Sequence, residues 1–498
     1  MPDNQSKHDV LKSVTFGQRI AEEEGDALAS YFVETDQWRK VLSGEVDIVY
    51  GPKGSGKSAI YSLLLANIAD LNGRAILVAQ GENPRGTPVF KELAADPPAS
   101  EIEFTSLWKL YFLSLMGALL RKTSLRGSSK FTHVLMVLEE SNLIAPMYSL
   151  KGILKGALDY VRHLQLEGTV ELDPITGTPK GFGGKITIRE PGVEARRLGM
   201  VSVDEMLHEV NDTLAENGIT LWIALDRLDV AFAESEDLEG NALRALFKVY
   251  LDMAAHDHIK LKIFLRDDIW KRITASGFRE ASHITRYIQI TWDSQSLLNL
   301  IIRRALYNDA LRGFYDVGAA EVLSSTEKQR ELFYRIFPQQ VDAGARKPST
   351  LDWMLSRTAD ATRQTAPREL IHLLSSARGV QLQRMELGYP QPPEGNLFDR
   401  AVLKEAMPEV SKVRFEQTLC AEYPHLAVSM RKLENDKTEQ TPASLARIWG
   451  VKRDEALATA EKLVDIGFFE RRGTKEEPSF WIPFLYRDAL RMLQGPAE

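Results

Sequence analysis

Eight consecutive residues have the types and spacing of a loop that binds phosphate. They are Gly51-Pro52-Lys53-Gly54-Ser55-Gly56-Lys57-Ser58, which is the complete P-loop pattern. Glycines in such a loop let backbone N–H groups turn towards phosphate oxygens, and the positive end of the following helix adds to the attraction. In this pattern Lys57 contacts the β- and γ-phosphates, and the hydroxyl of Ser58 ligates Mg²⁺. The sequence therefore predicts a Mg-ATP site at residues 51–58.

A P-loop also needs an acidic side chain for its metal, normally at the end of a buried strand. The apolar segment Ile219–Leu225 runs directly into Asp226, as in a Walker B strand. We expect Asp226 to bind Mg²⁺ directly or through a water molecule. The alternative interpretation is that Asp226 simply begins the loop after a strand.

The base that would activate water is harder to assign. Many hydrolysing P-loop proteins place a glutamate directly after the metal-binding aspartate, but here that position holds Arg227. Asp229 is the nearest carboxylate and the favoured candidate. Glu82, beyond the strand Arg74–Ala79, is a second candidate, because a neighbouring strand end can present a base to the same phosphate. A solvated loop carboxylate is the alternative for both, and for Glu82 it is the preferred interpretation.

The elements that must position these residues indicate an α/β fold. Five apolar strands alternate with helices: Glu45–Tyr50, Arg74–Ala79, Ile219–Leu225, Leu261–Leu265 and Tyr287–Ile290. This alternation suits a parallel sheet with helices on both faces, whose ligands bind at the carboxyl ends of the strands. A helix over Ala59–Ala69 follows the P-loop. Arg266 ends the fourth strand, where it would sense the γ-phosphate or form a salt bridge with Asp267 or Asp268.

Length and charge limit the classes of protein. The 498 residues correspond to about three domains. Apolar residues make up 44% and charged residues 26%, which excludes a wholly disordered, collagenous or membrane-embedded chain. The net charge of −7 is too acidic for coating nucleic acid by bulk charge, so any such surface must be local.

Cellular location is inferred from cysteine use and from the apolar segments. The single cysteine, Cys420, excludes an intrachain disulfide and fits a reducing cytosol, where it would be a buried apolar residue. The polar start, Met1–Val10, has no signal-peptide core. The most apolar run, Ser106–Leu120, is shorter than the roughly 20 residues of a membrane helix, so we expect a buried helix there. A cytoplasmic protein with no membrane partner follows.

The chain between the second strand and Asp226 is about 140 residues long and must contain an insertion, at about 85–210. We expect helices at Phe104–Arg121 and Ser149–Leu166, then a hairpin of Thr169–Leu172 with Lys185–Arg189. The domains are then a helical entry segment (1–44), a P-loop core (45–310), a helical lid (311–388, with helices in Leu351–Leu382) and a C-terminal domain (396–498). The linker Tyr389–Gly395 precedes the last domain.

The C-terminal domain has the pattern of a winged helix. Two amphipathic helices, Thr441–Trp449 and Arg453–Ile466, precede a hairpin of Phe468–Arg472 and Ser479–Pro483. The second helix and its first flanking residue carry three basic and four acidic side chains, namely Lys452, Arg453, Lys462, Asp454, Glu455, Glu461 and Asp465. The resulting net charge of −1 is unfavourable for binding in a phosphate-lined groove. Arg471, Arg472 and Lys475 partly compensate. DNA binding and packing against protein are equal alternatives for this domain.

Over roughly residues 15–490 the order of these motifs resembles the AAA+ and STAND classes of P-loop ATPases, and most closely bacterial families near the KAP and origin-recognition ATPases. The phrases that carry the resemblance are Tyr50–Ser58, Leu225–Asp229, Phe264–Asp268, Thr291–Asp293 and Pro367–Leu370. The resemblance implies that Arg266 is a sensor-1 residue and that Arg368 is a sensor-2 residue from the lid. The arginine at position 227 puts the rate of hydrolysis in doubt more than nucleotide binding.

The same resemblance implies two further roles. Phe16-Gly17-Gln18-Arg19, with Ala21–Glu24, would be an entry segment near the adenine, although the residues themselves indicate only a turn and an acidic helix start. Arg303 and Arg304 would be fingers for the nucleotide of a neighbouring subunit in a homo-oligomer, while adjacent arginines on a helix are more often solvated. The nine histidines form no convincing metal cluster, and His256-Asp257-His258 reads as a loop.

The sequence thus supports an ATP-binding and ATP-hydrolysing switch or motor of the bacterial cytosol. The resemblance implies work in DNA transactions or antiphage defence, with DNA or an effector protein as partner. The alternative is a nucleotide-gated module that binds DNA or protein with little turnover. A small-molecule P-loop kinase is disfavoured, because such chains are usually compact and have no winged helix.

Overall fold

The computed structural model describes the chain with the exception of residues 1–5, 26, 84–88, 92, 94–96, 99, 124, 126, 145–148, 167–185, 189, 198–199, 229–235, 276–277, 394 and 498. Its internal contacts divide it into two units. The sheet unit consists of Asp36–Gly51 and Lys57–Gln289, and the helical unit consists of Met1–Thr35, Pro52–Gly56 and Ile290–Glu498. The P-loop therefore contributes residues to both units.

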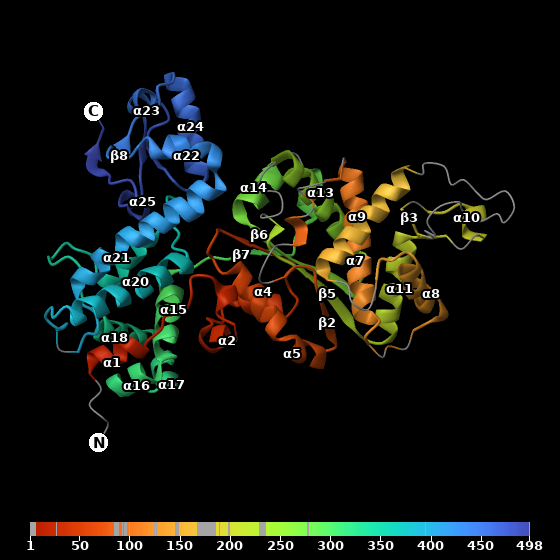
Figure 1. The fold of residues 1–498 in the computed structure, drawn as a ribbon, viewed down its shortest axis with the longest axis horizontal. Coiled ribbons are helices and arrows are strands. Elements are labelled where there is room, and N and C mark those ends of the chain that lie inside the picture. Colours follow the sequence, from red (N-terminus) through yellow and green to blue (C-terminus); the bar gives the residue numbers. More distant parts are fainter. Residues whose placement is uncertain are drawn as a thin grey trace. The chain divides into compact units, whose positions relative to one another are not determined.

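The sheet unit contains the five-stranded parallel sheet that the sequence predicts (Figure 1). Its order is β2 (Ile76–Gln80), β5 (Thr220–Leu225), β6 (Ile259–Arg266), β1 (Ile48–Gly51) and β7 (Tyr287–Gln289). Every neighbouring pair is parallel. Gly51 pairs in register with Arg266, and Leu225 pairs with Ile263. The strand ends that carry the P-loop, Arg266 and Asp226 therefore share one edge of the sheet.

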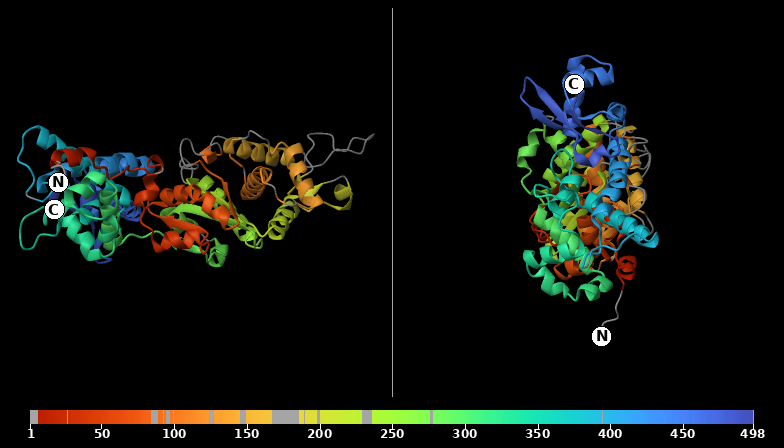
Figure 2. Two further views of the ribbon diagram at one scale, coloured as in Figure 1. Left: turned by 90° about the horizontal axis from the view of Figure 1, so that it is seen from below. Right: turned by 90° about the vertical axis from the view of Figure 1, so that its left-hand side faces the viewer.

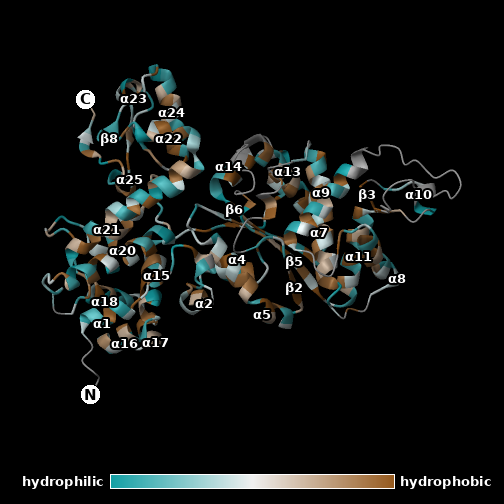
Figure 3. Cartoon of the chain, viewed as in Figure 1, coloured by the Kyte–Doolittle hydropathy of each residue, from teal (hydrophilic) through white to brown (hydrophobic). Residues whose placement is uncertain are grey.

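Helices cover both faces of this sheet. On one face, alternate residues of β6 such as Leu261 and Ile263 join a core with α7 (Glu101–Leu120) and α13 (Glu236–Met253). On the other face, Phe264 packs edge-on against Tyr61 of α4, with ring centroids 5.7 Å apart. The hydropathy colours of Figure 3 show hydrophobic residues along these strands. The buried helix predicted at Ser106–Leu120 is confirmed as part of α7, which Ser100 caps by accepting from the N–H of Glu103.

The helix that follows the P-loop differs from its predicted form. It begins at Lys57 and is divided into α4 (Lys57–Ala66) and α5 (Ile68–Gly73). Asn67, at the division, has φ −92° and ψ 14°. Its side-chain amide donates to the carbonyl of Leu63 at 2.7 Å, a local bond that competes with the helical ladder. The sequence therefore located the helix but missed its break.

The insertion is mainly helical. Its described helices are α7, α8 (Ser129–Glu140), α9 (Leu150–Leu166), α10 (Val193–Arg197) and α11 (Val203–Glu216). The first strand of the predicted hairpin, Thr169–Leu172, lies outside the described residues. Part of the second strand forms β3 (Ile186–Thr187), which pairs in parallel with β4 (Val201–Ser202). The sequence did not predict this parallel partner.

The helical unit joins the N-terminal segment to the chain after Ile290. Figures 1 and 2 show α1 (Lys7–Ser13) beside the helices of this later segment. Val10 and Leu11 of α1 belong to the same core as Cys420, which is buried as predicted. The main helices of the segment are α15 (Ser294–Leu306), α16 (Asp309–Tyr315), α17 (Ala319–Leu323), α18 (Thr326–Ile336), α19 (Thr350–Thr358), α20 (Pro367–Glu386), α21 (Arg400–Val413) and α22 (Pro424–Arg431). A π-helical segment, Arg414–Cys420, follows α21.

The end of the helical unit is a small α/β arrangement. Helices α23 (Pro442–Trp449) and α24 (Arg453–Asp465) are joined at Gly450, whose φ of 72° closes the first helix in a left-handed conformation. A four-stranded sheet follows the order β11 (Leu493–Pro496), β8 (Lys437–Gln440), β10 (Pro478–Trp481) and β9 (Glu470–Gly473). The short helix α25 (Phe484–Arg487) follows β10. Among the described helices of the whole chain, none combines the length and apolar character needed to cross a membrane.

Candidate nucleotide site

The P-loop connects the end of β1 at Gly51 to the start of α4 at Lys57. Gly54 and Gly56 have φ values of 83° and 103°, a left-handed backbone that glycine adopts without strain. The Lys57 ammonium donates to the carbonyl of Gly51 at 2.7 Å. The hydroxyl of Ser55 is buried and has no hydrogen-bond partner among the described residues. A phosphate group fits this loop, because backbone N–H groups, an ammonium and a helix start converge there.

The predicted metal ligands lie in the sheet unit. Ser58 is in the first turn of α4, and Asp226 directly follows β5 with only 3% of its surface exposed. One strand, β6, separates β5 from the P-loop strand β1. A hydroxyl and a carboxylate are the oxygen ligands that Mg²⁺ prefers. The donor set therefore fits Mg²⁺ held jointly with nucleotide phosphates.

Glu82 is not the solvated carboxylate that the sequence favoured. The residue is fully buried, and its carboxylate accepts the N–H of Asn83 at 2.7 Å and of Val89 at 2.9 Å. The preceding N–H, of Gly81, donates to Ala224 on β5 at 2.9 Å. Burial raises the pKa of Glu82 to about 7, close to the ideal for a general base at neutral pH. The other candidate, Asp229, lies outside the described residues.

Two arginines stand at the ends of β5 and β6. Arg227, in the position of the missing glutamate, has a left-handed φ of 60°, which is uncommon outside glycine and stores strain near functional sites. Arg266 binds Asp268 with two hydrogen bonds, of 2.9 and 2.8 Å. Of the two alternatives that the sequence left for Arg266, the salt bridge forms. Its sensor-1 role stays a prediction.

In the helical unit the P-loop contacts α20 and its neighbours. A Cβ atom at Gly54 would lie 3.0 Å from the Cβ of Arg368, so a side chain at this position would require Arg368 to shift by a few tenths of an ångström. The Nε of Arg368 is buried and makes no hydrogen bond within the described chain. Lys53 forms an ion pair with Glu422, and the indole N–H of Trp292 donates to the carbonyl of Ser55 at 2.8 Å. No pattern in the sequence indicates these last two contacts.

A cavity of about 300 Å³ lies beside this part of the P-loop. We call it the P-loop cavity; its walls include Arg19, Ile20, Lys53, Arg368, His372 and Arg414. Burial lowers the pKa of His372 to about 4, so the imidazole is neutral at pH 7. The wall therefore offers three cations besides Lys53, as an anionic ligand would require.

One of these cations belongs to a buried ion pair. Arg414 donates to Glu369 at 3.1 Å, and their side chains are 9% and 5% exposed. Although burial opposes the charge, the field of Glu369 raises the pKa of Arg414 overall. Arg414 therefore links the π-helical segment to the first turn of α20, next to Arg368. This pair joins residues that are 45 positions apart, so no local sequence pattern predicts it.

Arg304 is neither a finger nor a solvated residue. Its guanidinium is 6% exposed, donates to Glu24 and to the carbonyl of Phe16 at 2.6 Å each, and covers the ring of Tyr31 at 4.4 Å. An arginine that pairs with a buried carboxylate cannot contact the nucleotide of another subunit. Arg303 donates to Asn299 on its own helix.

The entry segment is positioned by this same pair. Phe16 is buried and has its ring centroid 6.2 Å from that of Phe398. A Cβ atom at Gly17, whose φ is 84°, would lie 1.9 Å from Nη1 of Arg304, so a larger residue would displace the guanidinium. Arg19 continues into the wall of the P-loop cavity. The proximity of this segment to the adenine stays a prediction.

Comparisons with known proteins find solved structures of low similarity. No protein-family model and no curated protein sequence matches the chain. The Aeropyrum pernix ORC1 protein in complex with DNA matches with 11% identity and a TM-score of 0.38, covering 95% of this chain and 96% of that one. The Aeropyrum pernix ORC2 protein in ADPNP–ADP complexes matches with 13% identity and a TM-score of 0.33, over 98% of each chain. Its ADP form matches with 12% identity and a TM-score of 0.32, over 95% and 92% of the two chains. At these values no residue's role is carried over.

Proposed function

We propose that this chain binds Mg-ATP at residues 51–58 and hydrolyses it, acting as a switch or motor. The observation that carries the proposal is the loop between β1 and α4. Two of its glycines have a left-handed backbone conformation, the Lys57 ammonium donates to the carbonyl of Gly51, and the hydroxyl of Ser55 is buried. Lys57 would contact the β- and γ-phosphates. Ser58 and Asp226 would hold Mg²⁺, which when bound stabilises negative charge on the phosphate oxygens.

The remaining residues of the proposed site have distinct tasks. Glu82 or Asp229 would accept a proton from the attacking water, and the raised pKa of Glu82 supports its candidacy. Arg368 would neutralise phosphate charge with a guanidinium whose Nε has no partner in the described chain. Arg266 would do the same only after releasing Asp268. This requirement supports a slow intrinsic turnover that a partner accelerates.

We propose that residues 396–498 form a winged helix. The order of α23, α24, β9 and β10 supports this interpretation. Both arginines of the hairpin already have carboxylate partners, since Arg471 pairs with Glu461 at 3.0 Å and Arg472 with Glu470 at 3.1 Å. This neutralisation favours packing against protein over binding of duplex DNA. The nucleotide-gated binding module with little turnover is therefore the second candidate.

By the sequence resemblance, the proposed setting is the bacterial cytosol, in DNA transactions or antiphage defence. DNA or an effector protein would be the partner, and the ATPase would act as a homo-oligomer. Since Arg304 is buried, an arginine finger for such an oligomer would have to come from elsewhere in the chain.

Steady-state ATP turnover of the full chain, with and without double-stranded DNA, separates the two candidates. The switch or motor predicts turnover that Lys57→Ala abolishes, because the ammonium that contacts the phosphates is lost. ATP binding without Lys57-dependent turnover under either condition would establish the gated module instead. Absence of both binding and turnover would refute the proposed nucleotide site.

A further inference from the structure

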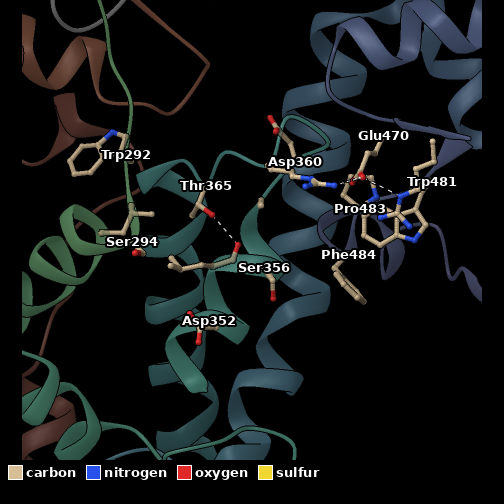
Figure 4. Close-up of a pocket in the computed structure, with 15 residues that line it drawn as sticks. Trp292, Ser294, Asp352, Ser356, Asp360, Thr365, Glu470, Trp481, Pro483 and Phe484 are labelled. Carbon is tan, nitrogen blue, oxygen red and sulfur yellow. Dashed lines mark hydrogen bonds and ion pairs between the residues drawn. The ribbon is translucent and has the colours of Figure 1, made fainter. Parts of the chain in front are cut away.

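The helical unit contains a second cavity, of about 510 Å³. We call it the hairpin cavity, because β9, β10 and α25 form one wall (Figure 4). The opposite wall comes from α19 and the start of α15, with Trp292 beside Ser294. The volume lies in the range of small-molecule sites, about 300–1,000 Å³. None of the motifs in the sequence predicts this cavity.

Three guanidinium groups surround the aromatic side chains of the hairpin wall. Arg472 lies 4.1 Å from the ring of Trp481, and Arg487 lies 4.5 Å from it. The ring of Phe484 is covered by Arg357 at 3.5 Å and by Arg487 at 4.0 Å. Arg472 itself lines the cavity, while Arg357 and Arg487 stand behind the aromatic rings.

These cations are not fully neutralised. Arg472 pairs with Glu470, but Arg357 and Arg487 make no ion pair within the described chain. Asp488 offsets part of their charge from beyond ion-pair distance, as Asp342 does for Arg357. Burial, with the neighbouring cations, lowers the pKa of Arg487 to about 10. On the cavity wall itself, Arg363 and Arg472 share the single carboxylate of Glu470, at 2.9 and 3.1 Å. The two guanidinium groups therefore exceed their shared carboxylate by one positive charge, and guanidinium groups with fixed donor geometry bind phosphate well.

The other residues that line the cavity indicate that its ligand has groups besides an anionic one. Asp352 and Asp360 place carboxylates in the wall, and Ser294 and Ser356 add hydroxyl groups. Carboxylates repel an acidic peptide, but they accept hydrogen bonds from the amino groups of a base or the hydroxyls of a sugar. Trp481 and Phe484 supply aromatic side chains against which a base can pack. Phosphate, hydroxyls and an aromatic base occur together in a nucleotide.

We propose that the hairpin cavity is a second nucleotide-binding site, separate from the P-loop. A free mononucleotide and the end of a single nucleic-acid strand share this chemistry, and the experiment below distinguishes them. Arg363 and Arg472, which together exceed the charge of their shared partner Glu470, bind the phosphate, and Asp352 and Asp360 accept from the base or sugar.

Trp292 connects this cavity to the P-loop. The residue lies at the edge of the cavity, while its indole N–H donates to the carbonyl of Ser55 at 2.8 Å. A ligand that displaces or fixes this ring acts on the P-loop backbone directly. Because linkage is reciprocal, nucleotide in the hairpin cavity and ATP at the P-loop change each other's affinity by the same factor. This coupling rests on the proposed function, whereas binding in the cavity does not.

The binding test uses the full chain carrying Lys57→Ala, so that the P-loop does not contribute. Calorimetric titrations with the four ribonucleoside monophosphates form one arm, and a single-stranded DNA dodecamer with a 5′-phosphate forms the other. We expect one nucleotide or one strand end per chain. Binding in the first arm alone identifies a free nucleotide as the ligand, and binding of the dodecamer alone identifies a strand end.

Arg471 and Arg472 provide a matched pair of variants. They are neighbours on β9, each side chain is 39% exposed, and each pairs with one glutamate. Only Arg472 faces the cavity. We expect Arg472→Gln to weaken binding by about tenfold or more, as for loss of a charge-assisted hydrogen bond, and Arg471→Gln to change it less than twofold. Arg363→Gln, outside the hairpin but also in the cavity wall, replaces Arg472→Gln if that variant does not fold.

Three results would overturn the proposal. They are no binding in either arm, equal affinities of the Arg471 and Arg472 variants, and binding of a poly-glutamate peptide in place of any nucleotide. Coupling is measured separately, as the ATP dissociation constant of the wild-type chain with and without the cavity ligand. If ATP does not bind the wild-type chain, the proposed function fails, while the titrations of the Lys57→Ala chain still decide the cavity.

Discussion

The helical unit holds two cavities of different origin. The P-loop cavity lies beside a contiguous motif, from which Lys53 enters its wall, and a buried Arg414–Glu369 ion pair stabilises that wall. The hairpin cavity is assembled from residues between 292 and 484, and its two lining arginines, Arg363 and Arg472, share one carboxylate, that of Glu470. Both cavities offer cations to a ligand, but the first is held together by a buried ion pair, whereas in the second two arginines share one glutamate on the wall.

This difference shows what a motif contributes to a site. The P-loop pattern specifies backbone conformation, so its residues must be adjacent in sequence. Side chains that bind by charge and stacking can come from any element, provided that the fold brings them together. We therefore expect changes in the P-loop cavity to affect stability and ATP binding, and a change of Arg472 in the hairpin cavity to affect ligand binding in that cavity.

The largest effect is expected from Arg414→Ala. Removing one partner of a buried pair leaves the Glu369 charge uncompensated, at a cost of about 3–5 kcal/mol in the free energy of unfolding. Urea denaturation followed by circular dichroism measures it. The control is Arg431→Ala, which removes an exposed arginine paired with Glu416 and should leave the midpoint unchanged. Equal midpoints for the two variants would show that the Arg414 pair does not hold the cavity together.

Gly54→Ala tests the close approach within the P-loop. A residue other than glycine at a φ of 83° costs about 1–3 kcal/mol, and the new Cβ would also press on that of Arg368. Gly56→Ala carries the backbone strain alone, since no atom lies within 4 Å of its Cβ position. We expect ATP affinity to fall by about tenfold or more for Gly54→Ala, and by less for Gly56→Ala. The reverse order would contradict the contact with α20.

The pH dependence of turnover tests Glu82. A base must be deprotonated to accept the proton of water, and the pKa of Glu82 is raised to about 7. Turnover should therefore rise about tenfold from pH 6 to pH 8, with its half-maximum near pH 7. Glu82→Gln should abolish this rise. A flat profile that is sensitive to Asp229→Asn would assign the base to Asp229 instead.

The smallest effect is expected from Trp292→Phe, which removes one hydrogen bond to the P-loop and keeps a ring at the edge of the hairpin cavity. Loss of a single bond of this kind costs about 1 kcal/mol, so ATP should bind about fivefold more weakly. Affinity for nucleotide in the hairpin cavity should stay within twofold, measured by the same titrations in the Lys57→Ala background. An unchanged ATP dissociation constant would show that Trp292 does not couple the hairpin cavity to the P-loop.

The sequence predicted those parts of the fold that repeat or run contiguously. Apolar strands ending in Asp226 and Arg266 indicated the parallel sheet, and the unbroken apolar run at Ser106–Leu120 indicated a buried helix. The break at Asn67 was missed, because it depends on a side-chain hydrogen bond to Leu63. A polar residue within a helical pattern gives no sign of which bond it will form.

The contacts that the sequence could not predict join distant residues. Arg304 and Glu24 are 280 positions apart, so no sequence pattern indicates that they form a buried ion pair. Glu82 looked like a loop residue, since nothing local shows that the N–H of Val89 closes over its carboxylate. The wall of the hairpin cavity combines Trp292 with Trp481. In each case the tertiary fold decides the environment of a side chain whose type alone allows several roles.

The most direct test of the central claim is equilibrium binding of a non-hydrolysable ATP analogue, with Mg²⁺, to the full chain and to Lys57→Ala. A nucleotide site at residues 51–58 predicts saturable binding by the wild-type chain and a loss of affinity of about 100-fold or more in the variant, because the ammonium makes charge-assisted bonds to two phosphates. Equal affinities for the two chains would show that residues 51–58 are not the nucleotide site.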